Sequence, residues 1–441
     1  MQPAVGTGVM DIDLGAARAA RVLGRGAMGT VFLVAAAEAE ADYALKVFDK
    51  RSHAATAPGR AEDAARRARW EVSVLSRLAH PHLPSLLGRA ETPDLLAWAM
   101  PYCAGGDLNE LRRAQPDRVF SPAAVRFYAA ELVSALADLH AAGIAYRDLK
   151  PENVLLRADG HVTLTDFDLS RLLPPKSPSA STCTSASSPC SSATPSPTAP
   201  KPHGRQYHHL RRIFARSESS VAASSGQEPH NLAWYLNRSD GGVDKLKKAK
   251  SARASTSLRR GKNHASFRLA AASGGVACER SFSFVGTEEY VAPEVVRGDG
   301  HEFSVDWWAL GVLVYEMAFG TTPFRGRNRK ETFRNVLLRE PEFSADVGRR
   351  WPDLTDLISR LLDKDPARRL GFSGGADEVR AHPFFAGVAW DLLGEVSRPP
   401  YIPPPADDIV ACEGFGVVEY FQKLHQPPPQ PDGSPESLPE F

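Results

Sequence analysis

Two short polar stretches of the sequence combine residue types that can move a phosphoryl group. The first, "YRDLKPEN", contains Asp148, Lys150 and Asn153, and the second, "TDFDLS", contains Asp166. Transfer to a hydroxyl needs a proton acceptor, a cation beside the phosphoryl oxygens and oxygen ligands for a divalent metal. We expect Asp148 to accept the proton and Lys150 to steady the transferred group. Asn153 and Asp166 would then hold the metal. A polar turn is the alternative for "RDLKPEN", although a match of this length and order is very improbable by chance.

A glycine-rich segment near the N-terminus could cover the phosphates of a nucleotide. In "GRGAMGTV", Gly24, Gly26 and Gly29 have the G-x-G-x-x-G spacing, and Val31 follows on a predicted strand. A tight hairpin explains such glycines equally well when the match stands alone. The phosphate interpretation therefore depends on the residues that follow.

An ammonium and a carboxylate further along the chain complete the set. Lys46 in "YALKVF" lies on the strand after the glycine-rich hairpin, where it could reach the α- and β-phosphates. Glu71 lies in the helical segment "RWEVSVL" and has the spacing to pair with Lys46. Taken singly, each residue type is most often solvated surface. Their order in this series is what indicates a catalytic role.

These residues need two kinds of scaffold. The segments "RVLGRGAMGTVFLV" and "YALKVFDK" alternate apolar and small residues, which is typical of twisted antiparallel strands, and residues 35–42 connect them. The spacing predicts a helix over "AEDAARRARWEVSVLSRL" and mostly helices after "PYCAGGDL", as in "AAVRFYAAELVSALADLHAAG" and "VDWWALGVLVYEMAFG". We therefore expect an α+β fold with a small antiparallel β lobe carrying one main helix and a larger, mainly helical lobe.

Composition divides the chain further. Residues 173–279 are rich in Ser, Thr, Pro and Ala and then in Lys and Arg, so they cannot bury enough apolar surface to offset their ordering entropy. We interpret them as a long disordered insertion before the activation segment of a catalytic domain spanning 21–385. The expected small lobe covers about 21–102 and the large lobe about 103–385. Residues 1–20 form an N-terminal segment, and 386–441 form a Pro-rich tail after the final helix.

Bulk properties constrain the surroundings of the protein. The 53 Lys and Arg residues nearly balance 52 Asp and Glu residues, so no nucleic-acid partner is expected. No apolar run approaches the roughly 20 residues of a membrane helix, and "MQPAVGTGVM" lacks a signal-peptide pattern. The five scattered cysteines favour reduced thiols inside the cell. We expect a cytoplasmic and nuclear location and a monomeric protein.

In this order the motifs resemble the eukaryotic protein kinase family over roughly 21–385, apart from the insertion. "YVAPEVV" resembles the substrate loop, where Glu294 should pair with Arg369, and Asp306 of "VDWWALG" should brace the catalytic loop. "DLKPEN" is similar to the serine/threonine branch, and "YRD", "GTEEYVAPE" and "RPPYIPPP" resemble the AGC group. The Asp-Phe-Asp triplet followed by a long insertion resembles the plant class VIII AGC kinases.

The resemblance implies a bilobal protein kinase fold and a serine/threonine protein kinase that uses ATP and Mg²⁺ in plant intracellular signalling. Asp168 stands where most kinases have Gly. Because Asp reaches positive φ only at a cost, we expect Asp168 to restrict the triplet to fewer conformations while Asp166 still binds metal. The nucleotide contacts implied by the resemblance are Leu23, Gly24, Arg25, Gly26, Ala27, Met28, Gly29, Val31, Lys46 and Cys103.

The resemblance also implies a regulatory serine and a pair of residues that read the substrate. Ser283 of "SFSFVGTEEY" matches the position that AGC kinases phosphorylate, and its phosphate could pair with Arg147. An ordinary loop serine is the alternative. Asp107 and Glu152 match positions that read basic residues, so we expect protein substrates with Arg or Lys before the target Ser or Thr. For Asp107, a solvated carboxylate without a reading role remains an alternative.

The tail and the insertion leave several interpretations open. Phe441 of "LPEF" could dock on the small lobe or recruit an upstream phosphoinositide-dependent kinase, but Leu438 presents less surface than the usual Phe, and a frayed end is equally compatible. Basic clusters within 205–262 fit contact with an anionic membrane such as the plasma membrane, nuclear import or simple solvation. A kinase-fold scaffold that acts by binding is the alternative function, which the intact catalytic set disfavours.

Overall fold

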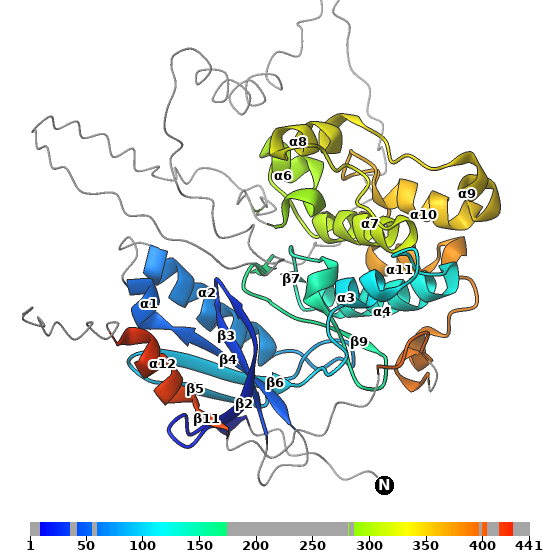
Figure 1. Ribbon diagram of the computed structural model, residues 1–441. Helices are drawn as coiled ribbons and strands as arrows, with labels where there is room; N and C mark the ends of the chain where they lie inside the picture. The colour runs from blue at the N-terminus through cyan, green and yellow to red at the C-terminus, as the bar shows by residue number, and fades with distance from the viewer. Residues whose placement is uncertain are drawn as a thin grey trace, which may run out of the picture. The chain divides into compact units, whose positions relative to one another are not determined.

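A seven-stranded sheet forms the small lobe of the protein. The computed structural model describes residues 9–35, 42–54, 60–173, 281, 286–396, 399–403 and 414–426. The strand order in the sheet is β1-β5-β6-β4-β3-β2-β11 (Figure 1). Strands β1 and β5 are parallel, whereas the other neighbours are antiparallel. The strands are β1 Met10–Asp11, β2 Arg18–Gly26, β3 Gly29–Val34, β4 Tyr43–Asp49, β5 Gly88–Glu91, β6 Leu95–Pro101 and β11 Phe415–Gly416.

Strand β4 lies inside this sheet and carries Lys46. It pairs with β3 on one side and β6 on the other, so that Lys46 lies opposite Val31 and Trp98. The β2–β3 hairpin beside it closes at Gly26 and Gly29. Gly29 has a φ of 129°, and a Cβ there would lie 2.3 Å from the carbonyl oxygen of Val47. The close approach of two backbones therefore requires glycine at this turn.

Helix α2, Arg60–Leu75, is the main helix of the small lobe and follows the short helix α1, Lys50–Ala54. Ala68, Val72 and Leu75 are buried in an apolar cluster that also contains Phe48 of β4. Positions three and four apart share one face of a helix. Glu71 lies on that same face and is fully buried, so the packing of α2 also determines where its carboxylate lies.

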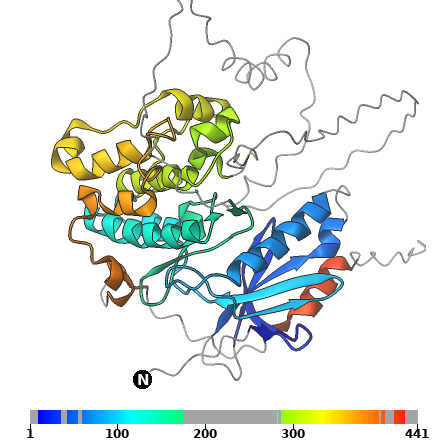
Figure 2. The same cartoon turned by 180° about the vertical axis from the view of Figure 1, so that it is seen from behind.

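The large lobe is mainly helical, as expected (Figure 2). Helix α4, Pro122–Ala141, begins at the cap Ser121 and packs against α7, Ser304–Phe319. Most of α7 is apolar and buried, which is typical of a helix enclosed on all sides. The other helices are α3 Leu108–Ala114, α6 Pro293–Arg297, α8 Arg329–Leu338, α9 Ala345–Arg350, α10 Pro352–Leu361 and α11 Gly375–Arg380. Short strands are β7 Ile144–Ala145, β8 Val154–Leu156, β9 Val162–Leu164 and β10 Arg171–Leu172.

Both ends of the described chain contribute to the small lobe, which differs from the boundaries expected at 21 and 386. Strands β1 and β2 begin at Met10 and Arg18, inside the segment 1–20. In the expected Pro-rich tail, β11 pairs with β2, and a further helix, α12 Val417–His425, follows. Phe421 of α12 packs edge-on against Phe32 of β3 with 5.9 Å between ring centroids. The apolar residues of α12 repeat at helical spacing, and the prolines on either side obscured that signal.

Several segments singled out in the sequence lie outside the described residues. They include most of the connection between β3 and β4, the insertion beyond Leu173, Ser283, and the chain end with Leu438 and Phe441. Within the ranges that the structure describes, no helix is long and apolar enough to cross a membrane.

Candidate active site

Three segments that are distant in the sequence meet at the ammonium of Lys46. Its Nζ donates to Glu71 Oε1 at 2.9 Å and Oε2 at 2.8 Å, and to Asp166 Oδ1 at 2.6 Å. Glu71 comes from α2, and Asp166 from the loop that follows β9. Burial lowers the pKa of Lys46, but the carboxylates of Asp166 and Glu71 outweigh this effect and raise the pKa overall. The ammonium therefore stays charged and joins β4, α2 and the triplet.

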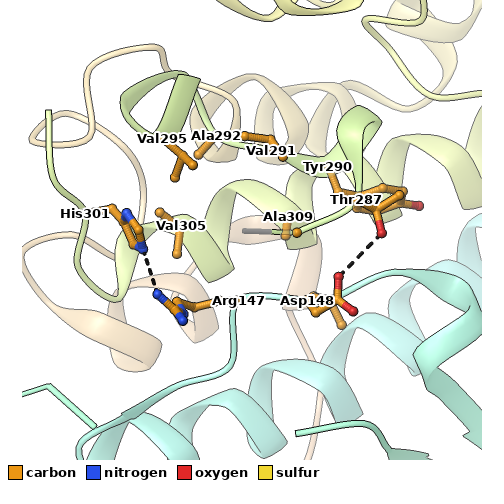
Figure 3. A pocket seen from close by; sticks show the side chains of 12 residues that line it. Arg147, Asp148, Thr287, Tyr290, Val291, Ala292, Val295, His301, Val305 and Ala309 are labelled. Carbon is orange, nitrogen blue, oxygen red and sulfur yellow. Dashed lines mark hydrogen bonds between the residues drawn. The ribbon is translucent and has the colours of Figure 1, made fainter. Parts of the chain in front are cut away.

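The carboxylate of Asp148 is oriented by its own loop. Oδ2 accepts hydrogen bonds from Lys150 Nζ at 2.8 Å and from Asn153 Nδ2 at 2.9 Å. Thr287, which follows the insertion, donates to Oδ1 at 3.4 Å (Figure 3). Burial raises the pKa of Asp148 above its ordinary value, although Lys150 and Asn153 offset part of this effect. A carboxylate held in this way can accept a proton from a hydroxyl placed beside it.

Strained backbone occurs at two of the predicted site segments. Arg147 and Asp166 have φ values of 68° and 64°, in the left-handed region that residues with a Cβ usually avoid. Asp306 stabilises the first of them. Its Oδ1 accepts from Arg147 N at 2.7 Å, and its Oδ2 accepts from Tyr146 N at 2.9 Å. The expected brace beneath the catalytic loop is therefore confirmed.

One residue of the triplet adopts the left-handed backbone region. Asp166 has positive φ, whereas Asp168 is not among the described non-glycine residues that do. In this conformation Asp168 incurs no positive-φ cost, and the strained residue is the first of the triplet, Asp166. Asp168 is nearly buried, and its burial, reinforced by Asp166, raises its pKa to about 6. The restriction of the triplet to fewer conformations stays a prediction.

The predicted nucleotide contacts lie on the β2–β3 hairpin, on β4 and after β6. A Cβ added at Gly24 or Gly26 would meet nothing within 4 Å. Packing within the described structure therefore does not explain these two glycines, and their contact with a nucleotide stays a prediction. Cys103 is partly buried, and burial raises the pKa of its thiol to about 11, so it stays neutral. Arg25, Gly26 and Ala27 are exposed, while Leu23, Gly24, Met28, Gly29 and Val31 are partly exposed.

The predicted substrate-reading residues already have partners within the protein. Asp107 caps helix α3, since its Oδ1 accepts from Glu110 N at 2.8 Å. Glu152 Oε1 accepts from Asn109 Nδ2 at 2.9 Å. Burial raises the pKa of Asp107, and Glu152 adds to this effect, which places the two carboxylates in one electrostatic neighbourhood.

A further acidic residue in this region, Glu316 of α7, was missed in the sequence. It accepts from Arg112 Nη2 at 2.9 Å and from the hydroxyl of Tyr290. Burial raises the pKa of the Tyr290 hydroxyl, and the negative charges of Glu316 and Glu152 add to this effect. These partners lie on α3, α7 and the segment after the insertion, and no local motif connects them.

A pocket lies between the catalytic loop and the segment after the insertion (Figure 3). At one end, Arg147 Nη1 donates to Nε2 of His301 at 3.2 Å. Burial, reinforced by Arg147, lowers the pKa of His301 to about 4, so its ring is neutral and can accept. Arg147 and Arg171 also donate to Ser281 Oγ at 2.9 and 3.1 Å. Ser283 lies outside the described residues, so its pairing with Arg147 stays a prediction.

A buried ion pair fixes the segment that borders this pocket. Arg369 Nη1 and Nη2 donate to the two carboxylate oxygens of Glu294 at 2.6 and 2.9 Å. The pairing expected from "YVAPEVV" and "DPARRLG" is therefore confirmed. It joins helix α6 to the segment between α10 and α11.

Comparison with known proteins agrees with this geometry. The family described as "Protein kinase domain" matches residues 18–190 and 270–385. The chain is 46% identical to the serine/threonine-protein kinase UCN of Arabidopsis thaliana, over 97% of this chain and 95% of that protein. It is 46% identical to the Arabidopsis serine/threonine-protein kinase UCNL, over 96% and 92%. It is 39% identical to the protein kinase PINOID of Oryza sativa subsp. japonica, over 87% and 68%.

Proposed function

The chain belongs to the protein kinase family, among the serine/threonine-protein kinases of the plant AGC group, and on this premise we propose how its residues transfer the γ-phosphoryl group of ATP. The contact of Lys46 with both Glu71 and Asp166 carries the proposal. Lys46 binds the α- and β-phosphates, and Glu71 keeps its ammonium in place. The β2–β3 hairpin covers the phosphates with backbone that Gly24 and Gly26 leave unobstructed.

Asp148 orients the substrate hydroxyl and accepts its proton. Oδ2 accepts from Lys150 and Asn153, whereas Oδ1 makes only the longer 3.4 Å contact with Thr287 among the side-chain hydrogen bonds of the described residues. We therefore assign proton acceptance to Oδ1. Lys150, beside the same carboxylate, offsets negative charge on the transferred phosphoryl group.

The residues of the loop suit a hard divalent cation such as Mg²⁺. Asp166 uses Oδ1 for Lys46, and its side chain is 38% exposed, so Oδ2 can face a ligand. Asn153 uses Nδ2 for both of its bonds to Asp148, which leaves Oδ1 as an oxygen donor. Carboxylate and amide oxygens are the ligands that Mg²⁺ prefers. When bound, the cation would neutralise charge on the phosphates, and Asp166 and Asn153 would hold it.

Transfer of labelled phosphate from ATP to a serine peptide tests this assignment. Asp148→Asn in the full chain should lower kcat by at least about 100-fold, because it removes the proton acceptor. Asp377→Asn, at an 89% exposed side chain on α11, is the matched control and should leave kcat unchanged. Undiminished transfer by Asp148→Asn would refute the assignment, and a wild-type chain without transfer would favour the scaffold alternative.

The preferred substrates are proteins with Arg or Lys before the target residue. Asp107 and Glu152 support this proposal, because the two carboxylates lie close enough to interact electrostatically, and each is held in place by a hydrogen bond from α3. Opposite charges across such a surface select partners more than they strengthen binding. A peptide library should therefore show a basic preference that Glu152→Gln weakens. An equal rate for acidic and basic peptides would contradict the proposal.

Regulation and location remain proposals about residues outside the described structure. Phosphorylation of Ser283 would order the neighbouring segment through Arg147, so Ser283→Ala should lower turnover markedly. Phe441 is proposed to contact an upstream phosphoinositide-dependent kinase. Removal of 205–262 should change the distribution of the protein in the cell if the basic clusters bind anionic membrane or direct nuclear import.

A further inference from the structure

Two consecutive hydrogen bonds connect helix α2 to the segment just after the triplet. Trp70 Nε1 on α2 donates to Ser170 Oγ at 3.0 Å. Ser170 Oγ donates to the carbonyl oxygen of Phe167 at 2.6 Å, and Ser170 N donates to the same oxygen at 3.1 Å. A serine hydroxyl has one proton and two lone pairs. Its proton goes to the carbonyl of Phe167, and a lone pair accepts from the indole of Trp70.

This connection runs beside the contact that defines the active site. Trp70 directly precedes Glu71, and Phe167 directly follows Asp166. The same two segments are therefore joined twice, once from Trp70 through Ser170 to Phe167 and once from Glu71 through Lys46 to Asp166. One turn earlier on α2, Arg67 Nη1 lies 3.9 Å from Asp168 Oδ2, which adds an ion pair between the same two segments.

A residue of the large lobe, Tyr146, also contacts the triplet and the residue before it. The hydroxyl of Tyr146 donates to the carbonyl oxygen of Thr165, and its ring lies 5.2 Å from that of Phe167. The triplet is thus attached to the large lobe by Tyr146 and to α2 by Ser170. A displacement of α2 away from the triplet must break the bond between Trp70 and Ser170.

We propose that Ser170 is a positioning residue, which through Trp70 and the carbonyl of Phe167 keeps α2 and the triplet in the register that brings Glu71 and Asp166 to Lys46. The inference rests on the proposed function and deepens it, because it identifies what holds the two acidic residues on one ammonium. Ser170 is 5% exposed. Its hydroxyl acts through its two partners and not on the substrate.

A double-mutant cycle in the full chain tests this role. Ser170→Ala removes both hydroxyl bonds, and Trp70→Phe removes the indole donor but keeps an aromatic ring at a half-buried position. Each should lower kcat/KM for ATP by about fivefold, the effect of losing the bond between Trp70 and Ser170 that both substitutions remove. The double variant should lose no more than either single variant, because the same connection is already broken. Amide hydrogen exchange over residues 60–75 should quicken equally in all three.

Ser76→Ala is the matched control. Ser76 Oγ, at the exposed end of α2, also donates to the carbonyl three residues before it, at 2.9 Å. It should change neither kcat/KM nor exchange within α2. Losses that multiply in the double variant, or unchanged exchange over residues 60–75 in Trp70→Phe, would overturn the positioning role. A wild-type chain that transfers no phosphate would refute the proposed function instead, and the exchange comparison would still decide the role of Ser170.

Discussion

The substitution Glu294→Gln should lower the unfolding temperature of the large lobe, because it breaks a buried ion pair. The side chains of Arg369 and Glu294 are 0% and 3% exposed. Burial raises the pKa of Glu294, but Arg369 outweighs this effect and lowers it, so both groups are charged. Arg369 also donates to Ser304 O at 2.9 Å and lies 5.1 Å from the ring of Trp308. These contacts fix the guanidinium of Arg369 in place. Because arginine does not lose its proton in proteins, the group would stay charged without Glu294.

The magnitude follows from this burial. Removal of one partner of a buried pair costs about 3–5 kcal/mol of unfolding free energy. Gln keeps one acceptor oxygen, so we expect the lower end of that range. At about 2–4 °C per kcal/mol for a unit of this size, the unfolding temperature should fall by about 6–12 °C. Arg349 and Asp346 form an exposed pair, at 77% and 92%, so Asp346→Asn is a matched control with a cost below about 1 kcal/mol.

Scanning calorimetry at one scan rate provides the measurement, since a chain of this length need not unfold reversibly. The combination of Glu294→Gln with Arg369→Met should recover part of the loss, because it removes the unpaired charge. A shift for Glu294→Gln no larger than that of Asp346→Asn would refute the reasoning. It would show that solvent, or the carbonyl oxygens of Ser304 and Asp363, stabilise the charge of Arg369 without Glu294.

Three further predictions concern pH, a helix cap and the ammonium. His161 donates to Glu131 and, at 3.0 Å, to the carbonyl of Val396, and Glu131 raises the pKa of His161. This stabilisation should be complete below the ordinary histidine pKa of about 6.5 and be lost as pH rises through the raised value, a loss that calorimetry should not find in Glu131→Gln. Asp107→Ala should cost about 1 kcal/mol of unfolding free energy through loss of the α3 cap and should weaken the preference for basic peptides. Lys46→Met should lower kcat/KM for ATP at least about 100-fold while the circular dichroism spectrum is retained.

The sequence predicted the candidate catalytic residues through the order of their segments along the chain. Lys46 lies in a buried strand, and the face of α2 that packs against the core also carries Glu71. The order of these elements along the chain was enough to predict that they meet. The alternation of β2, β3 and β4 and the helical spacing of α2, α4 and α7 likewise predicted the two lobes, since each pattern reflects one buried face.

The features that were missed depend on contacts between distant segments. The positive φ of Asp166 lies in the loop after β9, at the residue that contacts Lys46, and the residue types of the triplet did not predict it. Helix α12 is short and lies among prolines, and its register is set by packing on Phe32. The bond between Trp70 and Ser170 joins two residues that have no motif in common.

A crystal structure of the full chain with Mg²⁺ and a non-hydrolysable ATP analogue would test the central claim most directly. The account predicts the phosphates beneath the β2–β3 hairpin, Lys46 on the α- and β-phosphates, and the cation on Asp166 and Asn153. The γ-phosphate should face Oδ1 of Asp148. A nucleotide bound elsewhere, or a cation held without Asp166, would contradict it.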